Sequence, residues 1–131
     1  MTLDAATARK LAEDHCAAWT EQAPERVASR YAEDAIMIMN GGEPMTNRTQ
    51  ISEMAAGFMA DFPDLVLRLD TVLAANNHMV YAWTFEGRHN ESGNQVRFSG
   101  WEEWDLDKNL YVTRSLGWFD GDDYERQVTG A

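Results

Sequence analysis

The feature that most constrains the fold is a run of four stretches in the second half of the chain that follow the pattern of β-strands. They cover residues 65–75, 78–89, 95–107 and 110–120, and only short turns or loops separate them. Within residues 78–89, large apolar side chains alternate with smaller or polar ones, as in a strand with one buried face. Consecutive strands with short connections pair antiparallel, so the pattern predicts a meander.

The first half of the chain predicts three helices. The first covers residues 4–22, the second begins near Pro24, and the third follows Asn47, which forms a capping-box pattern with Gln50. A short apolar run at residues 35–39 predicts a buried strand. Helices followed by a curved antiparallel sheet predict an α+β fold in which the helices pack on one face of the sheet.

Length and composition narrow the class of protein. The 131 residues suit a single domain, which we expect to cover residues 1–131. The formal net charge of −11 argues against nucleic acid and anionic membrane partners, because both require clustered Lys and Arg. No signal-peptide pattern or long apolar run occurs, so we expect a cytoplasmic protein. The one cysteine, Cys16, predicts a small buried residue, with a reactive thiol as the alternative.

Aromatic side chains occur on both faces of the predicted strands. Tyr81 and Trp104 are examples from the two central stretches, Trp101 falls on the opposite parity from Trp104, and Tyr111 on the opposite parity from Trp118. A sheet that is apolar on both faces usually has a covering partner on each. We therefore expect a homodimer formed by contact between two sheets.

Five phrases resemble the nuclear-transport-factor-2-like superfamily, in particular its SnoaL-like polyketide cyclase branch. They are RYAEDAIMI (30–38), NRTQI (47–51), FPDLVLRLDTV (62–72), AWTFEGRH (82–89) and RSLGWFDGDDYERQ (114–127). The resemblance spans essentially the whole chain. It implies a cone-shaped, cystatin-like fold with a pocket between the helices and the concave face of the sheet. It implies no single reaction, because this fold carries isomerases, cyclases, dehydratases, hydrolases and binding domains.

The family's functional positions are only partly kept. SnoaL-like cyclases use an aspartate on the final strand, seven residues before a glutamine, as acid and base, and Asp120 and Gln127 keep this spacing. The cyclases also have a histidine on the preceding strand, where this chain has GWEEWDLD (100–107). In the related ketosteroid isomerases, the catalytic aspartate corresponds to Met39 and the oxyanion-binding tyrosine to His15. Met39 cannot take a proton, so the resemblance does not imply the isomerase mechanism.

Three residues are predicted to be catalytic. Asp120 is the first candidate for a general acid or base, because a carboxylate beside aromatic walls has a raised pKa. The alternative is that Asp120 belongs to a solvated turn. His15, on the apolar face of the first helix, and His89, at the end of a strand, could each donate to an oxyanion or pass a proton. For His15 the alternative is an ordinary core histidine. The three histidines lack the spacing of metal ligands, so no metal site is predicted.

Further residues are predicted to bind the substrate. They are Glu102, Arg114, Trp19, Tyr31, Trp83, Trp104 and Trp118. Glu102 and Glu103 point to opposite faces of their strand, so one of them reaches inward or into the dimer interface. A buried inward glutamate would be a credible base, but a salt bridge to Arg97 or Arg114 is the ordinary expectation.

These residues predict an enzyme that needs no cofactor and moves a proton next to a carbonyl, as in cyclisation, isomerisation or dehydration. The substrate would be a small apolar or aromatic molecule held between tryptophans. One alternative is a non-catalytic module that binds a small ligand. Another is a dimerisation domain whose interior is filled by side chains, which a cavity of less than about 300 Å³ would favour.

Overall fold

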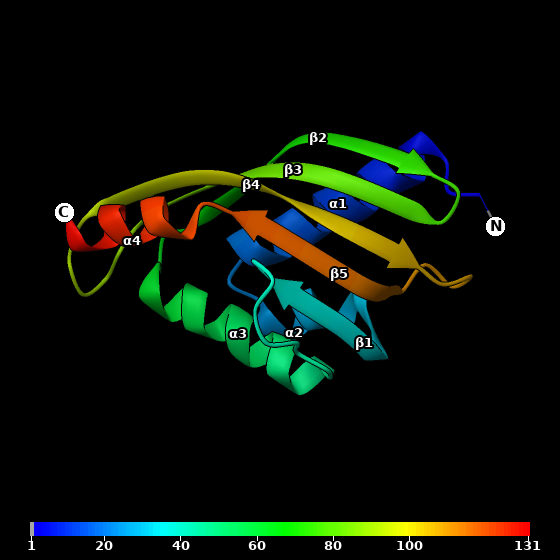
Figure 1. Ribbon diagram of the computed structural model, residues 1–131, viewed down its shortest axis with the longest axis horizontal. Coiled ribbons are helices and arrows are strands. Elements are labelled where there is room, and N and C mark those ends of the chain that lie inside the picture. The colour runs from blue at the N-terminus through cyan, green and yellow to red at the C-terminus, as the bar shows by residue number, and fades with distance from the viewer. Residues whose placement is uncertain (1) are drawn as a thin grey trace.

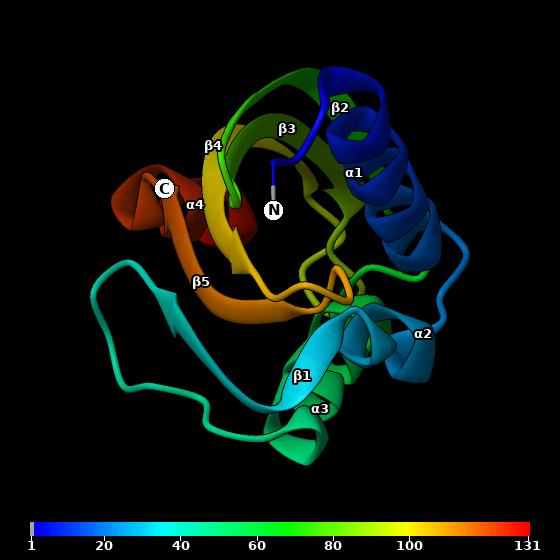
Figure 2. The same cartoon turned by 90° about the vertical axis from the view of Figure 1, so that its right-hand side faces the viewer.

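A computed structural model describes residues 2–131 as a strongly curved five-stranded sheet with helices on its concave side (Figures 1 and 2). In Figure 2 the sheet forms an arc, and α1 lies across the open side of that arc. The elements in chain order are α1 (Ala5–Thr20), α2 (Pro24–Ser29), β1 (Tyr31–Met39), α3 (Arg48–Asp61), β2 (Val66–Ala75), β3 (His78–Arg88), β4 (Gln95–Leu106), β5 (Val112–Phe119) and α4 (Gly121–Thr129). The predicted α+β class, with three helices packed on a curved sheet, is confirmed.

The sheet has the strand order β1-β5-β4-β3-β2. Strands β2 to β5 form the predicted antiparallel meander, and β1 joins its far edge parallel to β5. The register of β4 places Glu102 opposite Gly117 of β5 and Tyr81 of β3. Register shifts occur in the β2–β3 and β4–β5 pairs, and such irregularities bend and twist a sheet locally. The bent sheet leaves a concave face that the helices cover.

Side-chain caps fix where the two long helices begin. Asp4 accepts a hydrogen bond from the backbone N–H of Thr7 at 2.7 Å, and α1 starts at the next residue. Asn47 accepts one from the backbone N–H of Gln50 at 2.9 Å and starts α3, as the sequence predicts. Each such cap pairs a backbone N–H that has no partner within the helix.

The chain ends in a helix, α4, that the sequence analysis did not predict. Asp120 caps α4 by accepting a hydrogen bond from the backbone N–H of Asp123 at 3.0 Å, and Gly130 ends it with a φ of 77°. Asp122 and Asp123 in the first turn and Arg126 in the last complement the helix dipole. These are ordinary helix signals, and Asp120, predicted as a general acid or a solvated turn residue, is the N-cap of this helix.

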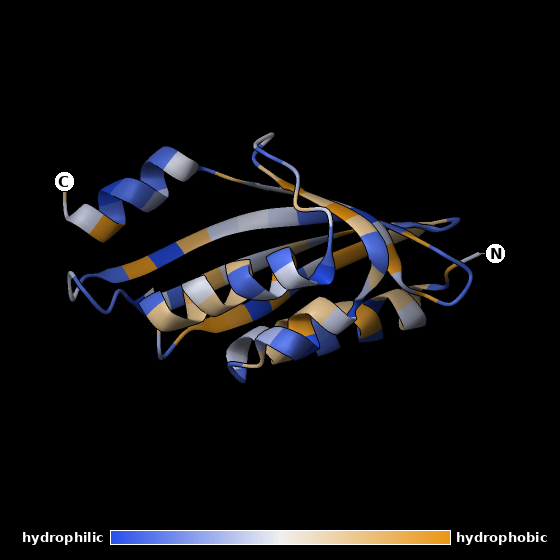
Figure 3. Cartoon of the chain, turned by 90° about the horizontal axis from the view of Figure 1, so that it is seen from below, coloured by the Kyte–Doolittle hydropathy of each residue, from blue (hydrophilic) through white to orange (hydrophobic). Residues whose placement is uncertain are grey.

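The core lies between α1, α3 and the concave face of the sheet. Seen from below, helices lie in front of the strands, and both contain apolar and polar residues (Figure 3). The largest side chains that are almost fully buried include Trp104, Tyr31, Tyr81, Phe62 and Ile51. The neighbouring strands β3 and β4 contribute five aromatic residues to this face, namely Tyr81, Trp83, Phe85, Phe98 and Trp104. Among residues 2–131 no helix is long and apolar enough to cross a lipid bilayer.

Candidate functional site

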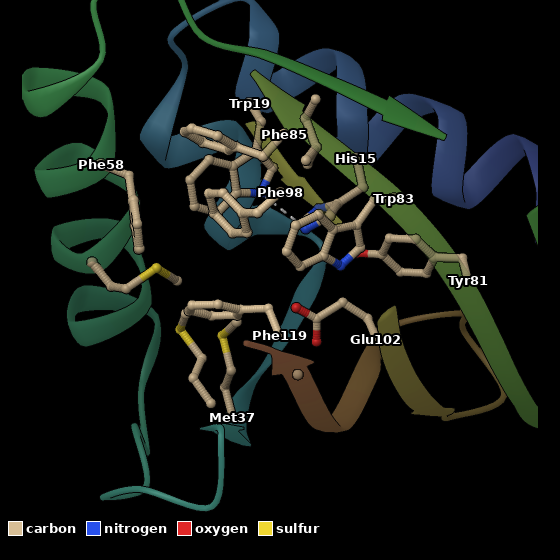
Figure 4. Close-up of a pocket in the computed structure, with 14 residues that line it drawn as sticks. His15, Trp19, Met37, Phe58, Tyr81, Trp83, Phe85, Phe98, Glu102 and Phe119 are labelled. Atoms are coloured by element: carbon tan, nitrogen blue, oxygen red, sulfur yellow. Dashed lines mark hydrogen bonds between the residues drawn. The ribbon is translucent and has the colours of Figure 1, made fainter. Parts of the chain in front are cut away.

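A cavity lies between the concave face of the sheet and helices α1 and α3 (Figure 4). Its volume is about 50 Å³, which is room for roughly three to five water-sized groups. The lining consists of His15, Trp19, Met37, Met39, Met54, Phe58, Leu67, Tyr81, Trp83, Phe85, Phe98, Glu102, Gly117 and Phe119. Most of these side chains are aromatic or contain sulfur, so the cavity is an apolar site.

Glu102 supplies the one carboxyl group in this lining. It lies on β4 in the inward-facing row with Phe98 and Trp104, and only 9% of its surface is exposed. The Ser115 hydroxyl donates a hydrogen bond to its Oε2 at 3.2 Å. Burial raises the pKa of Glu102 from 4.5 to about 8; the Ser115 hydrogen bond opposes this rise, and the Glu103 charge adds to it. Glu102 therefore gains and loses its proton close to neutral pH.

The absence of a side chain at Gly117 makes room for the Glu102 carboxyl group. A Cβ atom at position 117 would lie 2.7 Å from Oε1 and 2.8 Å from Oε2 of Glu102. Both distances are shorter than any normal contact between a carbon and an oxygen, so no other residue fits here with the carboxyl in place. The glycine of β5 thus sets where the Glu102 side chain can lie.

His15 approaches the cavity from α1. Its Nε2 accepts a hydrogen bond from the Trp19 indole N–H at 3.3 Å, which places the ring hydrogen on Nδ1. Burial is the main cause that lowers the pKa of His15 to about 3, and the charge of Arg30 lowers it further. The imidazole is therefore neutral at physiological pH, and Nδ1 is a buried donor without a hydrogen-bond partner among residues 2–131.

Two tyrosines and a tryptophan lie close to Glu102 and His15. The ring centroid of Trp104 is 5.0 Å from that of His15, 4.8 Å from Tyr81 and 6.2 Å from Tyr31. Burial raises the pKa of both tyrosine hydroxyls, and the Glu102 charge is the next largest cause. Both phenols therefore keep their protons, and no Lys or Arg of residues 2–131 forms an ion pair with Glu102.

The structure brings four of the predicted site residues into the cavity lining: His15, Trp19, Trp83 and Glu102. Tyr31 and Trp104 are fully buried beside them but are not part of the lining. In Figure 4 the Glu102 carboxyl group points into the space between Phe119 and the cluster of Trp83 and Phe98.

Asp120 does not lie in the cavity, although the sequence analysis placed it beside the pocket. It is exposed and caps α4. Gln127, the second residue of the family spacing, clamps α4 to β4: it accepts from the Arg97 N–H at 2.6 Å and donates to the Arg97 carbonyl at 2.8 Å. In this chain Asp120 caps α4 and Gln127 attaches α4 to β4, so the two residues hold a helix in place. The acid role of Asp120 stays a prediction that this geometry does not support.

Three further predicted residues also lie outside the cavity. His89 is at the end of β3, where its Nδ1 is 3.0 Å from the Ser92 hydroxyl. Arg114 and Trp118 lie on the outward-facing row of β5, because Ser115, Gly117 and Phe119 take the inward positions. His89, Arg114 and Trp118 therefore do not line the cavity, contrary to the prediction from the sequence.

The salt bridge expected for Glu102 does not form. Arg97 lies within 3.8 Å of Glu86 instead, and no ion pair among residues 2–131 involves Glu102. Glu103 faces outward and accepts a hydrogen bond from the Trp118 indole at 3.0 Å. Of the two adjacent glutamates, it is thus Glu102 that reaches the interior, without a cation beside it.

Several lining residues were missed, among them the three methionines and Phe58. Met54 and Phe58 lie on the predicted inward face of α3, so helical periodicity could have identified them. Met37 and Met39 come from β1, whose position beside β5 depends on a parallel pairing across most of the chain. Among residues 2–131 no cluster of three or more His, Cys, Asp or Glu side chains could hold a metal ion.

Comparison with known proteins gives the following findings. A family model described as a SnoaL-like domain matches residues 12–113. No curated protein matches the sequence. A protein with a ketosteroid isomerase-like fold from Catenulispora acidiphila, solved in complex with trimethylamine, is 18% identical with a TM-score of 0.82, over 91% of this chain and 92% of that one.

Two other solved structures are similar over nearly the full length. AclR, a candidate hydroxylase from Streptomyces galilaeus, is 15% identical with a TM-score of 0.85, over 98% of this chain and 99% of that one. A candidate polyketide cyclase from Xanthomonas campestris is 16% identical with a TM-score of 0.78, over 92% of this chain and 96% of that one. At such identities the likeness establishes the fold, not the reaction.

Proposed function

The chain belongs to the SnoaL-like domain family, and we propose that it is a small-molecule enzyme in which Glu102 transfers a proton without a cofactor. The reaction would be proton removal or addition at a carbon next to a carbonyl group. This assignment keeps the reaction class that the sequence predicts and moves the acid from Asp120 to Glu102.

The observation that carries the proposal is a carboxyl group in an apolar cavity with a pKa raised to about 8. A general acid or base works best when its pKa lies near the working pH, because both protonation states are then populated. Exposed carboxylates do not meet this condition. Glu102 meets it because burial disfavours its charged form and no neighbouring cation compensates.

His15 supports the same reaction as a neutral hydrogen-bond donor. Removing a proton next to a carbonyl places negative charge on the carbonyl oxygen, and a preorganised donor in a dry site stabilises that charge. The His15 ring stays neutral because its pKa is lowered to about 3, so it donates without competing for the proton of Glu102. Its Nδ1–H has no partner among residues 2–131 and is available for a substrate oxygen.

The cavity volume limits the substrate. About 50 Å³ admits a compact molecule, whereas drug-sized ligands occupy pockets of about 300–1,000 Å³. Met37, Met39 and Met54 line the cavity, and methionine is the most adaptable apolar side chain. A larger substrate would require these side chains to change rotamer.

The proposal is tested by proton exchange in deuterated water, followed by NMR with small ketones and 1,3-diketones as substrates. The protein should accelerate exchange at the carbon next to the carbonyl, with a rate that rises as Glu102 ionises around pH 8. Glu102→Gln should lower that rate by about 100-fold or more. Glu103→Gln, which changes the outward neighbour, removes only the smallest of the contributions to the Glu102 pKa and should change the rate far less than Glu102→Gln does. Full activity in Glu102→Gln would disprove the assignment.

A second candidate is a non-catalytic module, either one that binds a small ligand or a dimerisation domain whose interior is filled by side chains. The cavity volume, below about 300 Å³, favours the dimerisation domain of these two. A thermal-shift screen between pH 5 and 9, with mass spectrometry of each ligand after incubation, separates the two functions. Ligands that stabilise the protein and are recovered chemically unchanged at every pH would favour the module.

A further inference from the structure

We propose that the cavity at Glu102 binds a small alkylammonium cation, with the Glu102 carboxylate as the counter-ion and the aromatic rings as the walls. This goes beyond the proton transfer proposed above, since it assigns a second class of ligand to the same carboxyl group. It does not depend on turnover, and its test measures binding alone.

Glu102 forms no ion pair with another side chain of residues 2–131. Its Oε2 accepts one hydrogen bond from Ser115, and no side chain among residues 2–131 donates to its Oε1. A buried carboxylate is stable only when it is paired or hydrogen-bonded, and otherwise takes up a proton. A cation placed in the cavity would supply the missing partner.

The aromatic lining of the cavity also suits a cation. Seven of the fourteen lining residues are aromatic apart from His15: Trp19, Phe58, Tyr81, Trp83, Phe85, Phe98 and Phe119. The face of an aromatic ring is negative and attracts a cation, most strongly for tryptophan, and such cages recognise methylated ammonium groups. In Figure 4, Phe58 and Phe119 lie on two sides of the open space, and Glu102 points toward it from a third.

The volume of the cavity and the net charge of the protein both favour a small cation. A volume of about 50 Å³ fits roughly three to five heavy atoms, which is the size of a trimethylated or tetramethylated ammonium. A larger hydrated cation, or one with a long polar tail, would require the methionine side chains of the lining to move. The net charge of −11 adds a favourable field for any cation that approaches.

Binding of a cation should release a proton at neutral pH. The pKa of Glu102 is raised to about 8, so its carboxyl is mostly protonated at pH 7. The groups around it are the neutral His15, the Cys16 thiol and the Tyr31 and Tyr81 phenols, which keep their protons because burial raises the pKa of each, and the Glu103 carboxylate on the outer face. The positive charge of Arg30 acts on His15 and Tyr31 and is constant over this pH range. Glu102 is therefore the group that gives up the proton when the cation enters.

The experiment is isothermal titration calorimetry of the wild-type protein with tetramethylammonium chloride and with tert-butanol. The alcohol has a similar size and branching but no charge. Tetramethylammonium should bind about 10-fold more tightly at pH 9 than at pH 7, because the ionised fraction of Glu102 rises from about 0.1 to 0.9. At pH 7, buffers of different ionisation enthalpy should reveal release of nearly one proton per cation. The alcohol should show neither effect.

Two variants test the roles of the carboxylate and the rings. Glu102→Gln should lower the affinity for tetramethylammonium at pH 9 by more than about 10-fold, because the counter-ion is lost. Glu103→Gln is the matched control: it removes only the neighbouring charge that adds to the Glu102 pKa, and because Glu102 is already mostly ionised at pH 9, it should bind there nearly as tightly as the wild type. Phe58→Leu keeps an apolar side chain in the cavity wall but removes the ring face. It should therefore weaken the binding of tetramethylammonium and leave the binding of tert-butanol unchanged.

Equal affinity for the cation and the alcohol, or cation binding without a pH dependence, would overturn the proposal. If Glu102→Gln does not fold, the pH dependence and proton release of the wild type still decide. The outcomes also separate this inference from the proposed function. Cation binding without proton exchange on ketones would disprove the enzyme alone, and exchange without cation binding would disprove the cation site alone.

Discussion

The buried carboxyl of Glu102 should make the protein less stable as pH rises from 4.5 to 8. The unfolded chain releases the Glu102 proton near pH 4.5, whereas the folded protein holds it until about pH 8. Between these values the folded state binds more protons than the unfolded state, so the free energy of unfolding falls by about 1.4 kcal/mol per pH unit. From pH 5 to pH 8 the loss amounts to roughly 3–4 kcal/mol.

His15 acts in the opposite direction over a lower range. Its pKa is about 3 in the folded protein and 6.5 in the unfolded chain, so the unfolded state binds more protons between these values. The stability contributed by neutral His15 is therefore complete above pH 6.5 and is lost as pH falls toward 3. Between pH 4.5 and 6.5 the two effects cancel. Together, Glu102 and His15 predict that the free energy of unfolding is nearly constant between pH 4.5 and 6.5. It should fall below pH 4.5, and it should fall again between pH 6.5 and 8.

The assay is urea unfolding followed by tryptophan fluorescence from pH 3.5 to 8.5, at one fixed protein concentration. The comparison is with Glu102→Gln, which cannot ionise. Relative to this variant, the wild type should lose roughly 3–4 kcal/mol between pH 5 and 8, because only the wild type ionises at this position. The difference between the two proteins removes contributions from other titrating groups. Parallel curves over this range would show that Glu102 is not held protonated, and would refute both the burial argument and the acid–base role.

Four further predictions concern Gly117, Gly57, Asp120 and the outer face of the sheet. Gly117→Ala should destabilise the protein by about 1–3 kcal/mol, because the added methyl group displaces the Glu102 carboxyl. Gly57→Ala, whose methyl group would lie in open space on α3, should instead stabilise the protein by about 0.5–1 kcal/mol in the same urea assay. Asp120→Ala should cost about 1 kcal/mol through the lost cap of α4 and leave proton exchange unchanged; loss of exchange would restore Asp120 as the acid. We also propose that the outer face of the sheet, where Trp101 is 47% exposed, forms a homodimer. Light scattering should find twice 14.8 kDa, and a 14.8 kDa particle would disprove the dimer.

Local patterns were sufficient to predict most of the elements. The alternation in residues 78–89, the Asn47 cap and the proline at position 24 each act within a few residues, so a single stretch of sequence contains the whole signal. The parallel pairing of β1 with β5 could not be predicted in the same way. It joins Tyr31 to Val112, and nothing within either strand specifies a partner that far away.

The candidate site was harder to predict because it depends on which face of each strand turns inward. On β4 the row Val96, Phe98, Gly100, Glu102, Trp104 and Leu106 is buried throughout, and its apolar members already indicate that Glu102 faces the core. On β5 the pattern is misleading, since the outward residues Leu116 and Trp118 are more apolar than the inward residues Ser115 and Gly117. That pattern is why Trp118 was expected in the pocket, although it lies on the outer face.

The register between β4 and β5 explains why Glu102 has space in the interior at all. A glutamate on an inward strand position normally meets the side chain of its neighbour on the next strand, and the apolar contact expels the carboxyl. Here the neighbour is Gly117, and the Ser115 hydroxyl two residues away supplies a hydrogen bond. The carboxyl stays buried because one strand lacks a side chain opposite it and also offers it a donor. A chemical site of this kind follows from a pair of strands, and neither strand alone indicates it.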